Sequence, residues 1–153
     1  MAAELQILGR AVKQAQYRQH RALDSRLANA AGTTLAQWDA LRAISRSPGA
    51  SARTLAAATF QSEQAFGTLA GRLVAQGLVD RRPGHGRRIE HHLTPAGEAT
   101  LKAGHQVADE VLAECFAPLS GAERTTLLGL LRRLTDEPGE SGQSGEYGGP
   151  SAR

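Results

Sequence analysis

Basic side chains are concentrated in one short stretch of the sequence, residues 78–93. It holds four arginines and three histidines, and only two acidic residues. The basic residues are Arg81, Arg82, His85, Arg87, Arg88, His91 and His92. Guanidinium groups at this density bind phosphates and can also hydrogen-bond the edges of bases. The stretch therefore predicts binding to a polyanion.

A polar helix face is expected directly before this stretch. Ser62 is typical of a helix N-cap and Gly77 of a helix end, so residues 63–76 are predicted to be helical. Helical spacing turns four residues toward the core: Ala65, Phe66, Leu69 and Leu73. Four others share the outward side: Gln64, Gly67, Thr68 and Gly71. The two glycines are either tolerated surface positions or places where a partner approaches the backbone closely.

The basic stretch itself reads as a β-hairpin. Residues 78–82 and 87–93 alternate as strands do, and residues 83–86 have the composition of a turn. A basic hairpin behind a helix with a polar outer face is typical of proteins that bind double-stranded DNA, because the helix fits the major groove while the cations reach phosphates. Arg87 and Arg88 alternate along the predicted strand, so only one of them is expected to point into a groove. The candidate DNA-binding residues are Ser62, Gln64, Gly67, Thr68, Gly71, Arg81, Arg87 and Arg88.

The remaining elements are predicted to be helices. A long helix over residues 4–30 is followed by one that opens at the capping box Thr34–Gln37 and by a short one over residues 52–58. After the hairpin, Thr94-Pro95 opens a helix to about Phe116, with Leu101, His105, Ala108, Leu112 and Cys115 or Phe116 on one stripe. A last, leucine-rich helix begins at Ser120. The predicted fold is mainly α with a small β-wing, a winged helix-turn-helix lobe plus a helical dimerisation region.

The two ends of the chain differ from the centre in character. Residues 1–32 and 95–135 are expected to form the dimerisation region, since their apolar stripes are longer than so small a chain can cover. Its candidate interface residues are Leu5, Leu8, Val12, Leu112, Phe116, Leu127, Leu128, Leu131 and Leu134. Residues 33–94 are expected to be the DNA-binding lobe. Residues 136–153 read as a disordered acidic tail, with four carboxylates against one arginine and a net charge of −3. Since the whole chain has a net charge of +3, residues 1–135 carry +6.

Other function classes find little support in the sequence. The chain lacks a nucleophile–base pair, a phosphate-binding glycine loop and a metal-ligand spacing, so we expect neither an enzyme nor a cofactor. A single cysteine, Cys115, fits a reducing compartment, and on its apolar stripe it is expected to be a buried thiol. Without a signal sequence or an apolar run of about 20 residues, a cytoplasmic protein with no membrane contact is expected.

Several short motifs, in order, resemble the multiple-antibiotic-resistance regulator (MarR) family of bacterial transcription factors. They comprise Thr34–Leu41, Leu55-Ala56, Gly77–Arg81, and Arg87 followed by Leu93–Gly97. Residues 59–64 resemble a variant found in a subset of that family. The resemblance covers about residues 4–135. It implies a homodimer whose first and last two helices interlock and whose two winged lobes bind a pseudo-palindromic operator.

The same resemblance implies roles for particular residues. Arg87 takes the place of the wing-tip arginine that enters the minor groove, but His85 stands where the family usually has the acid that pairs with it. A pocket for a small effector, often an aromatic acid, is implied between lobe and dimerisation region, where Tyr17, His20 and Trp38 are the candidates. Trp38 could equally be a core anchor and Tyr17 an interface residue. We therefore expect a repressor relieved by an effector, or alternatively an effector-independent DNA-binding protein regulated by its abundance or by a protein partner.

Overall fold

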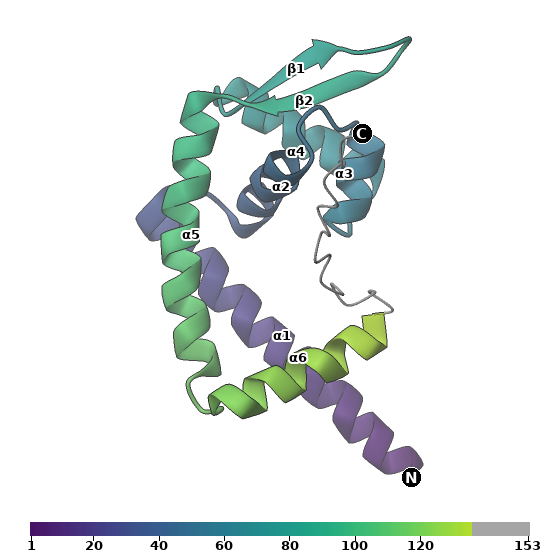
Figure 1. Ribbon diagram of the computed structural model, residues 1–153, viewed down its shortest axis with the longest axis vertical. Coiled ribbons are helices and arrows are strands. Elements are labelled where there is room, and N and C mark those ends of the chain that lie inside the picture. Colours follow the sequence, from purple (N-terminus) through teal and green to yellow (C-terminus); the bar gives the residue numbers. More distant parts are fainter. Residues whose placement is uncertain (136–153) are drawn as a thin grey trace, which may run out of the picture. The chain divides into compact units, whose positions relative to one another are not determined.

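The computed structural model describes residues 1–135, which comprise six helices and a two-stranded hairpin (Figure 1). In chain order these are α1 (Ala2–Ala31), α2 (Leu35–Arg46), α3 (Ala52–Ala58), α4 (Glu63–Ala75), β1 (Val79–Pro83), β2 (Ile89–Leu93), α5 (Pro95–Phe116) and α6 (Gly121–Thr135). The fold class is the one predicted, mainly α with a small β-wing. The acidic tail expected over residues 136–153 lies outside the described residues.

Side-chain caps set the starts of the helices in the lobe. Thr34 and Gln37 form the predicted capping box, in which the Thr34 hydroxyl accepts from the Gln37 amide at 3.1 Å. Ser51 caps α3 and Ser62 caps α4 in the same manner. Because each cap satisfies amide groups that a helix start leaves unpaired, local sequence is sufficient to place these three starts.

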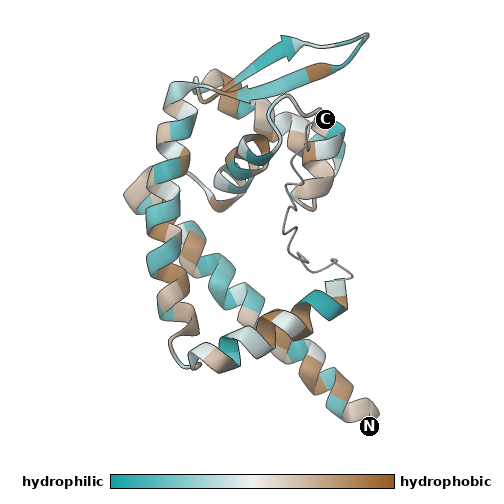
Figure 2. Ribbon diagram, viewed as in Figure 1, coloured by the Kyte–Doolittle hydropathy of each residue, from teal (hydrophilic) through white to brown (hydrophobic). Residues whose placement is uncertain are grey.

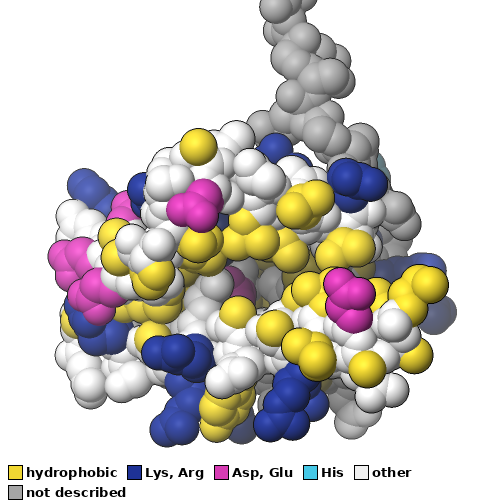
Figure 3. Space-filling model, turned by 90° about the horizontal axis from the view of Figure 1, so that it is seen from below, with side chains coloured by type: hydrophobic (Ala, Val, Ile, Leu, Met, Phe, Trp, Pro, Cys, Tyr) yellow, Lys and Arg dark blue, Asp and Glu magenta, His cyan; other side chains and the backbone are white. Residues whose placement is uncertain are grey.

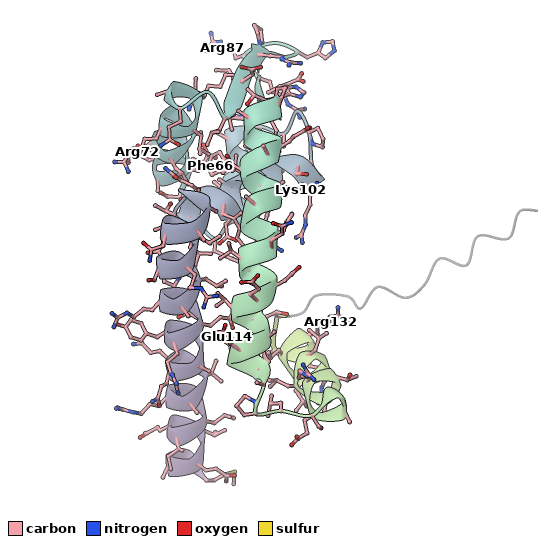
Figure 4. All side chains as sticks on the ribbon, turned by 90° about the vertical axis from the view of Figure 1, so that its left-hand side faces the viewer. Phe66, Arg72, Arg87, Lys102, Glu114 and Arg132 are labelled. Atoms are coloured by element: carbon pink, nitrogen blue, oxygen red, sulfur yellow. The ribbon has the colours of Figure 1, made fainter. Side chains whose placement is uncertain are left out.

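The lobe is built from α2, α3 and α4, and the hairpin β1–β2 projects from it as a wing (Figure 1). The strands are antiparallel, with Val79 opposite Leu93 and Pro83 opposite Ile89. The core inside the lobe contains Leu41, Ile44, Leu55, Phe66, Leu73 and Val79, each almost fully buried. Figure 4 shows Phe66 turned into this core and Arg72, on the same helix, turned away from it.

Helix α1 contacts the rest of its unit only through its C-terminal part. Leu23 and Leu27 are its buried residues, and Asp24 accepts a 2.9 Å hydrogen bond from the amide of Leu35, at the start of α2. Arg26 forms ion pairs with Glu110 and Glu114 of α5 at 3.5 and 3.3 Å. The helix ends at Gly32, whose φ of 63° is the left-handed conformation that suits glycine.

The buried stripe of α5 differs from the predicted one. The structure buries Gly97, Leu101, Gly104, Ala108 and Val111, whereas His105 is exposed and Leu112 and Phe116 are only half-buried. The reason is a close approach through glycine, since a β-carbon at Gly97 would overlap the carbonyl of Leu78. Hydrophobic periodicity cannot reveal a stripe whose contact points are glycines. Cys115 lies off this stripe and is exposed, so the expectation of a buried thiol was wrong.

Helix α6 belongs to a second compact unit, which begins at Phe116. Its start is the predicted capping box, in which Ser120 and Glu123 exchange hydrogen bonds of 2.9 and 3.2 Å. Hydrogen bonding to the carboxylate by the Ser120 amide, and secondarily by the Ser120 side chain, lowers the pKa of Glu123. None of the residues from Gly121 to Thr135 is buried.

Candidate functional site

The outward face of α4 is small and polar, as predicted. Gln64 and Thr68 are exposed, and the Thr68 hydroxyl donates to the Gln64 carbonyl at 3.1 Å. Ser62, the N-cap, accepts from the Ala65 amide at 3.1 Å. The inward face departs from the prediction at one position: Ala65 is exposed and Ala70 is buried in its place. The buried stripe is centred on Phe66, Leu69, Ala70 and Leu73, so Ala65 falls just beyond its edge.

The two glycines of α4 have different surroundings. No atom lies within 4 Å of the position that a β-carbon would take at Gly67. A β-carbon at Gly71 would lie 4.0 Å from Nη2 of Arg81. Nη2 of Arg81 also donates a 3.0 Å hydrogen bond to the carbonyl oxygen of Gly67. A strand arginine therefore lies along the outward face of the helix, across the glycines.

At the tip of the wing, the prediction that Arg87 and Arg88 alternate along a strand was wrong. Strand β2 begins at Ile89, so both arginines lie in the turn and do not alternate along a strand. The turn is closed by a 2.8 Å hydrogen bond from the Gly84 amide to the Arg88 carbonyl, with Gly86 at a φ of 65°. Pro83 is the last paired residue of β1 and lies opposite Ile89, so the connection runs over residues 84–88 and includes both arginines.

The two turn arginines have different partners. Nη2 of Arg88 donates to the carbonyl of Gly49 at 3.2 Å, which ties the tip of the wing to the α2–α3 connection. Arg87 is exposed at the far end of the wing (Figure 4), and no carboxylate among residues 1–135 lies within ion-pair distance of it. Strand alternation predicted only that one of these two neighbours would point into a groove. The fold shows that Arg88 is hydrogen-bonded to Gly49, whereas Arg87 has no ion-pair partner among residues 1–135.

The base of the wing rests on a buried histidine. His91 is 2% exposed, its Nδ1 lies 3.0 Å from the Ala50 carbonyl, and its ring meets that of Phe66 edge-on at 6.0 Å. Burial lowers the pKa of His91; the Ala50 carbonyl acts in the opposite direction, and the charges of Arg81 and His92 lower it further. His92, the next residue along β2, is half-buried, and its Nε2 lies 3.2 Å from the Glu90 carboxylate. The neutral imidazole of His91 thus links the wing to α4.

A hollow of about 430 Å³ lies within the unit formed by residues 1–115. It is lined by Gln16, Gln19, His20 and Leu23 of α1, by Leu35, Trp38, Asp39 and Arg42 of α2, by Phe60, and by His105, Ala108, Asp109 and Leu112 of α5. Of the three predicted effector residues, His20 and Trp38 lie here. Tyr17 is not among the lining residues; it is exposed and contacts Arg21 on its own helix.

The hollow combines an aromatic wall with a cation. The guanidinium of Arg42 lies 4.5 Å from the ring of Trp38 and 3.5 Å from the carboxylate of Asp39. His105 meets Trp38 edge-on at 5.5 Å. Burial raises the pKa of Asp39, and Arg42 partly offsets that rise. Sequence reasoning missed Arg42, although its position four residues after Trp38 places both on one helix face.

The predicted interface leucines are exposed in the single chain. Leu5 is 63% exposed and Leu134 74%, and Leu8, Val12, Leu128 and Leu131 are also exposed, while Leu127 is half-buried. Figure 2 shows hydrophobic residues recurring along α1 toward the N-terminus, and Figure 3 shows exposed hydrophobic side chains beside basic ones. Exposed leucine at this density costs free energy that burial would recover.

Within residues 1–135, no three His, Cys, Asp or Glu side chains are grouped so as to hold a metal ion. In the same part of the chain no helix has the length and apolar character needed to cross a bilayer.

Curated relatives share much of this chain. A transcriptional regulatory protein for the hcr operon of Thauera aromatica is 33% identical over 112 residues, which cover 72% of this chain and 68% of that protein. The transcriptional regulator HosA of Escherichia coli is 31% identical over 103 residues, covering 66% of this chain and 76% of its own.

Solved structures agree with the fold. A probable transcriptional regulator from Pseudomonas aeruginosa has a TM-score of 0.71 at 34% identity, covering 82% of this chain and 95% of its own. A mutant MarR from E. coli complexed with operator DNA has a TM-score of 0.79 at 25% identity, covering 86% and 95%. A Mycobacterium tuberculosis MarR family protein in complex with p-aminosalicylic acid has a TM-score of 0.70 at 26% identity, covering 84% and 98%. With the MarR family profile matching residues 31–89 as well, this winged-helix chain belongs to the MarR family of transcriptional regulators.

Proposed function

We propose that this protein is a homodimeric transcription regulator that binds a pseudo-palindromic duplex through one winged lobe of each subunit, formed by residues 33–94. The observation that carries the proposal is that one lobe combines a small, polar helix face with a wing whose terminal arginine has no partner within the described chain. A helix face without bulky side chains can enter the major groove, and an uncompensated guanidinium at the wing tip can reach the adjacent minor groove or a phosphate.

The residues divide by role. Gln64 and Thr68 supply hydrogen-bonding groups for base edges, and Ser62, at the start of α4, is placed to meet a phosphate at the helix N-terminus. Arg87 supplies affinity. Arg88 acts mainly by holding the wing, because its guanidinium already donates to Gly49. The MarR structure from E. coli complexed with operator DNA supports duplex DNA as the partner.

Dimerisation is proposed through residues 1–32 and 95–135. Its support is the row of exposed leucines on α1 and α6, which a second copy would remove from water. In sedimentation equilibrium, the wild-type protein should have twice the chain mass of 16.2 kDa. A double variant, Leu128→Glu with Leu131→Glu, should shift it toward the monomer. A wild-type monomer at micromolar concentration would contradict this part of the proposal.

A small aromatic acid is proposed as the effector, bound in the hollow beside Trp38. Arg42 offers a cation for its carboxylate, and Trp38 offers a surface for its ring. The complex of the M. tuberculosis relative with p-aminosalicylic acid supports this ligand class. The effector would favour a lobe spacing that no longer matches successive major grooves, roughly 34 Å apart. The alternative is a regulator without an effector, governed by its own abundance or by a protein partner.

The DNA proposal is tested first, with a duplex selected from a random library. Arg87→Ala should weaken binding in gel shifts across a salt series. The slope of the logarithm of the binding constant against the logarithm of the salt concentration should become shallower, by the amount that about one phosphate contact contributes. Lys102→Ala is the matched control, since it removes one exposed cation from α5, away from the wing tip (Figure 4). Equal binding by wild type and Arg87→Ala at every salt concentration would remove the wing from the interface.

The effector proposal has its own readout, because Trp38 is the only tryptophan of the chain. Salicylate or p-aminosalicylate should change Trp38 fluorescence and raise the melting temperature, since a ligand that binds the native state stabilises it. Arg42→Gln should weaken both responses, whereas Arg46→Gln, one turn further along α2, should leave them unchanged. A panel of aromatic acids without any melting shift would favour the effector-independent alternative.

A further inference from the structure

Arg81 belongs to the wing, but its guanidinium lies against α4. It belongs to β1, opposite His91, and its guanidinium Nη2 donates to the Gly67 carbonyl at 3.0 Å. Gly67 lies on the outward stripe of α4, together with Gln64, Thr68 and Gly71. The side chain remains exposed in this position. The outward face of α4 therefore includes an arginine that the helix sequence itself does not contain.

Glycine at position 71 provides the room for this arrangement. A β-carbon there would lie 4.0 Å from Nη2 of Arg81, so a longer side chain would compete with the guanidinium for the same space. The sequence left open whether the helical glycines are tolerated surface positions or sites of close approach. At Gly71 the approaching group is an arginine of the same chain.

The charge of Arg81 is not used elsewhere in the described chain. Arg82 forms an ion pair with Asp80 at 3.7 Å and Arg53 with Glu63 at 3.9 Å, but no carboxylate of residues 1–135 lies within ion-pair distance of Arg81. A guanidinium has five N–H donors, and the bond to Gly67 uses one. The other donors remain for a ligand, on a side chain that is already held in place.

We propose that Arg81 is a sequence-reading residue and that its target is a guanine in the major groove of each half-site. The inference rests on the proposed function, since it requires the outward face of α4 to enter that groove. Guanine presents two acceptors there, O6 and N7, and the fork of an arginine matches both. The bond to Gly67 fixes the guanidinium before DNA arrives, so less side-chain entropy is lost on binding.

The experiment compares wild type with Arg81→Ala and Arg81→Lys on a duplex selected by the wild type. The Lys variant keeps the charge and loses the fork. A bidentate pair worth about 1–3 kcal/mol of discrimination corresponds to roughly 5- to 150-fold, and both variants should lose that factor at one guanine of each half-site. Arg82→Ala, one residue along the same strand, is the matched control and should keep full discrimination at that base.

A change in the DNA provides the second arm, and its first readout uses the wild-type protein alone. Replacing that guanine by 7-deazaguanine removes the N7 acceptor and should weaken wild-type binding severalfold, while costing Arg81→Ala nothing further. If Arg81→Ala instead weakens all sequences equally and makes the salt dependence shallower, Arg81 contacts phosphate and the inference is wrong. If wild type discriminates and Arg81→Ala discriminates equally well, the inference fails while the proposed function stands. Failure of wild type to retain any duplex would overturn the proposed function itself.

Discussion

The indole of Trp38 lies directly against the backbone of Gly104, so closely that a β-carbon at position 104 would overlap the ring. The Trp38 Nε1 donates to the Leu101 carbonyl at 3.4 Å, one turn earlier on the same helix. This contact brings α2 and α5 together and forms one wall of the hollow that also contains Arg42 and His105. A glycine therefore sets the position of the tryptophan that we propose as part of the ligand pocket.

Gly104→Ala should destabilise the protein. The added methyl must displace Trp38 or part the two helices, and overpacking of this kind costs about 1–3 kcal/mol. Urea unfolding followed by circular dichroism measures the change. Gly67→Ala is the matched control, because it is also a helical glycine but its β-carbon would meet no atom within 4 Å. If Gly104→Ala were stabilised as much as Gly67→Ala, Trp38 would have to move aside freely.

The Gly67→Ala variant also separates stability from DNA binding. Alanine is favoured over glycine in a helix by roughly 1 kcal/mol, so the variant should unfold at higher urea concentration than wild type. If α4 lies close to DNA along its outward face, the added methyl should nevertheless weaken binding to the selected duplex in gel shifts. A variant that is more stable and binds as tightly as wild type would show that DNA does not approach at this position.

The stability of the protein should depend on pH through His91. Burial, as the largest cause, lowers the folded-state pKa of His91 below its ordinary value of 6.5. A lowered pKa means that the unfolded chain takes up the proton first, so this stability is present above about pH 6.5 and lost as pH falls toward the folded-state pKa. A single group contributes a slope of at most about 1.4 kcal/mol per pH unit.

The measurement is the free energy of unfolding at pH 7.5 and pH 5.5. His91→Gln keeps a donor for the Ala50 carbonyl but does not titrate, so its stability should change less between the two pH values. His92→Gln, which alters the neighbouring residue beside Glu90, should retain the part of the slope that comes from His91. An identical slope in wild type and His91→Gln would exclude His91 as the titrating group.

Phe60 should be replaced at a lower cost in stability by glycine than by alanine. It is 95% exposed and has a φ of 56° in the turn between α3 and α4, a conformation that bulky residues rarely adopt. Phe60→Gly should be more stable than Phe60→Ala by about 1–2 kcal/mol, because both lack the ring and only alanine keeps the β-carbon that disfavours this conformation. Thermal melting of the two variants tests the difference. Equal melting temperatures would mean that the turn relaxes once the ring is removed.

Local sequence was sufficient for the elements and their order. Four helix starts are set by side-chain caps, each of which depends on residues within one turn of itself. These caps are the Thr34–Gln37 pair, Ser51, Ser62 and the Ser120–Glu123 pair. The outward face of α4 also followed from spacing alone, since helical periodicity fixes which residues share a side. In the same way, His91 and His92 differ in burial because successive residues of a strand point to opposite faces.

Tertiary structure alone decided which neighbours each side chain meets. The sequence could not show that Arg88 reaches Gly49, 39 residues away, or that Arg81 reaches Gly67, 14 residues away. Nor could it show that Arg87 has no ion-pair partner among residues 1–135. It also could not show that α5 packs through Gly97 and Gly104, since glycine carries no hydrophobic signal. Helix caps and side-chain periodicity depend on residues that are close in the sequence, so the sequence predicts them. Contacts between distant segments depend on how the helices pack. In residues 1–135 that packing decides which arginines have a partner within the chain.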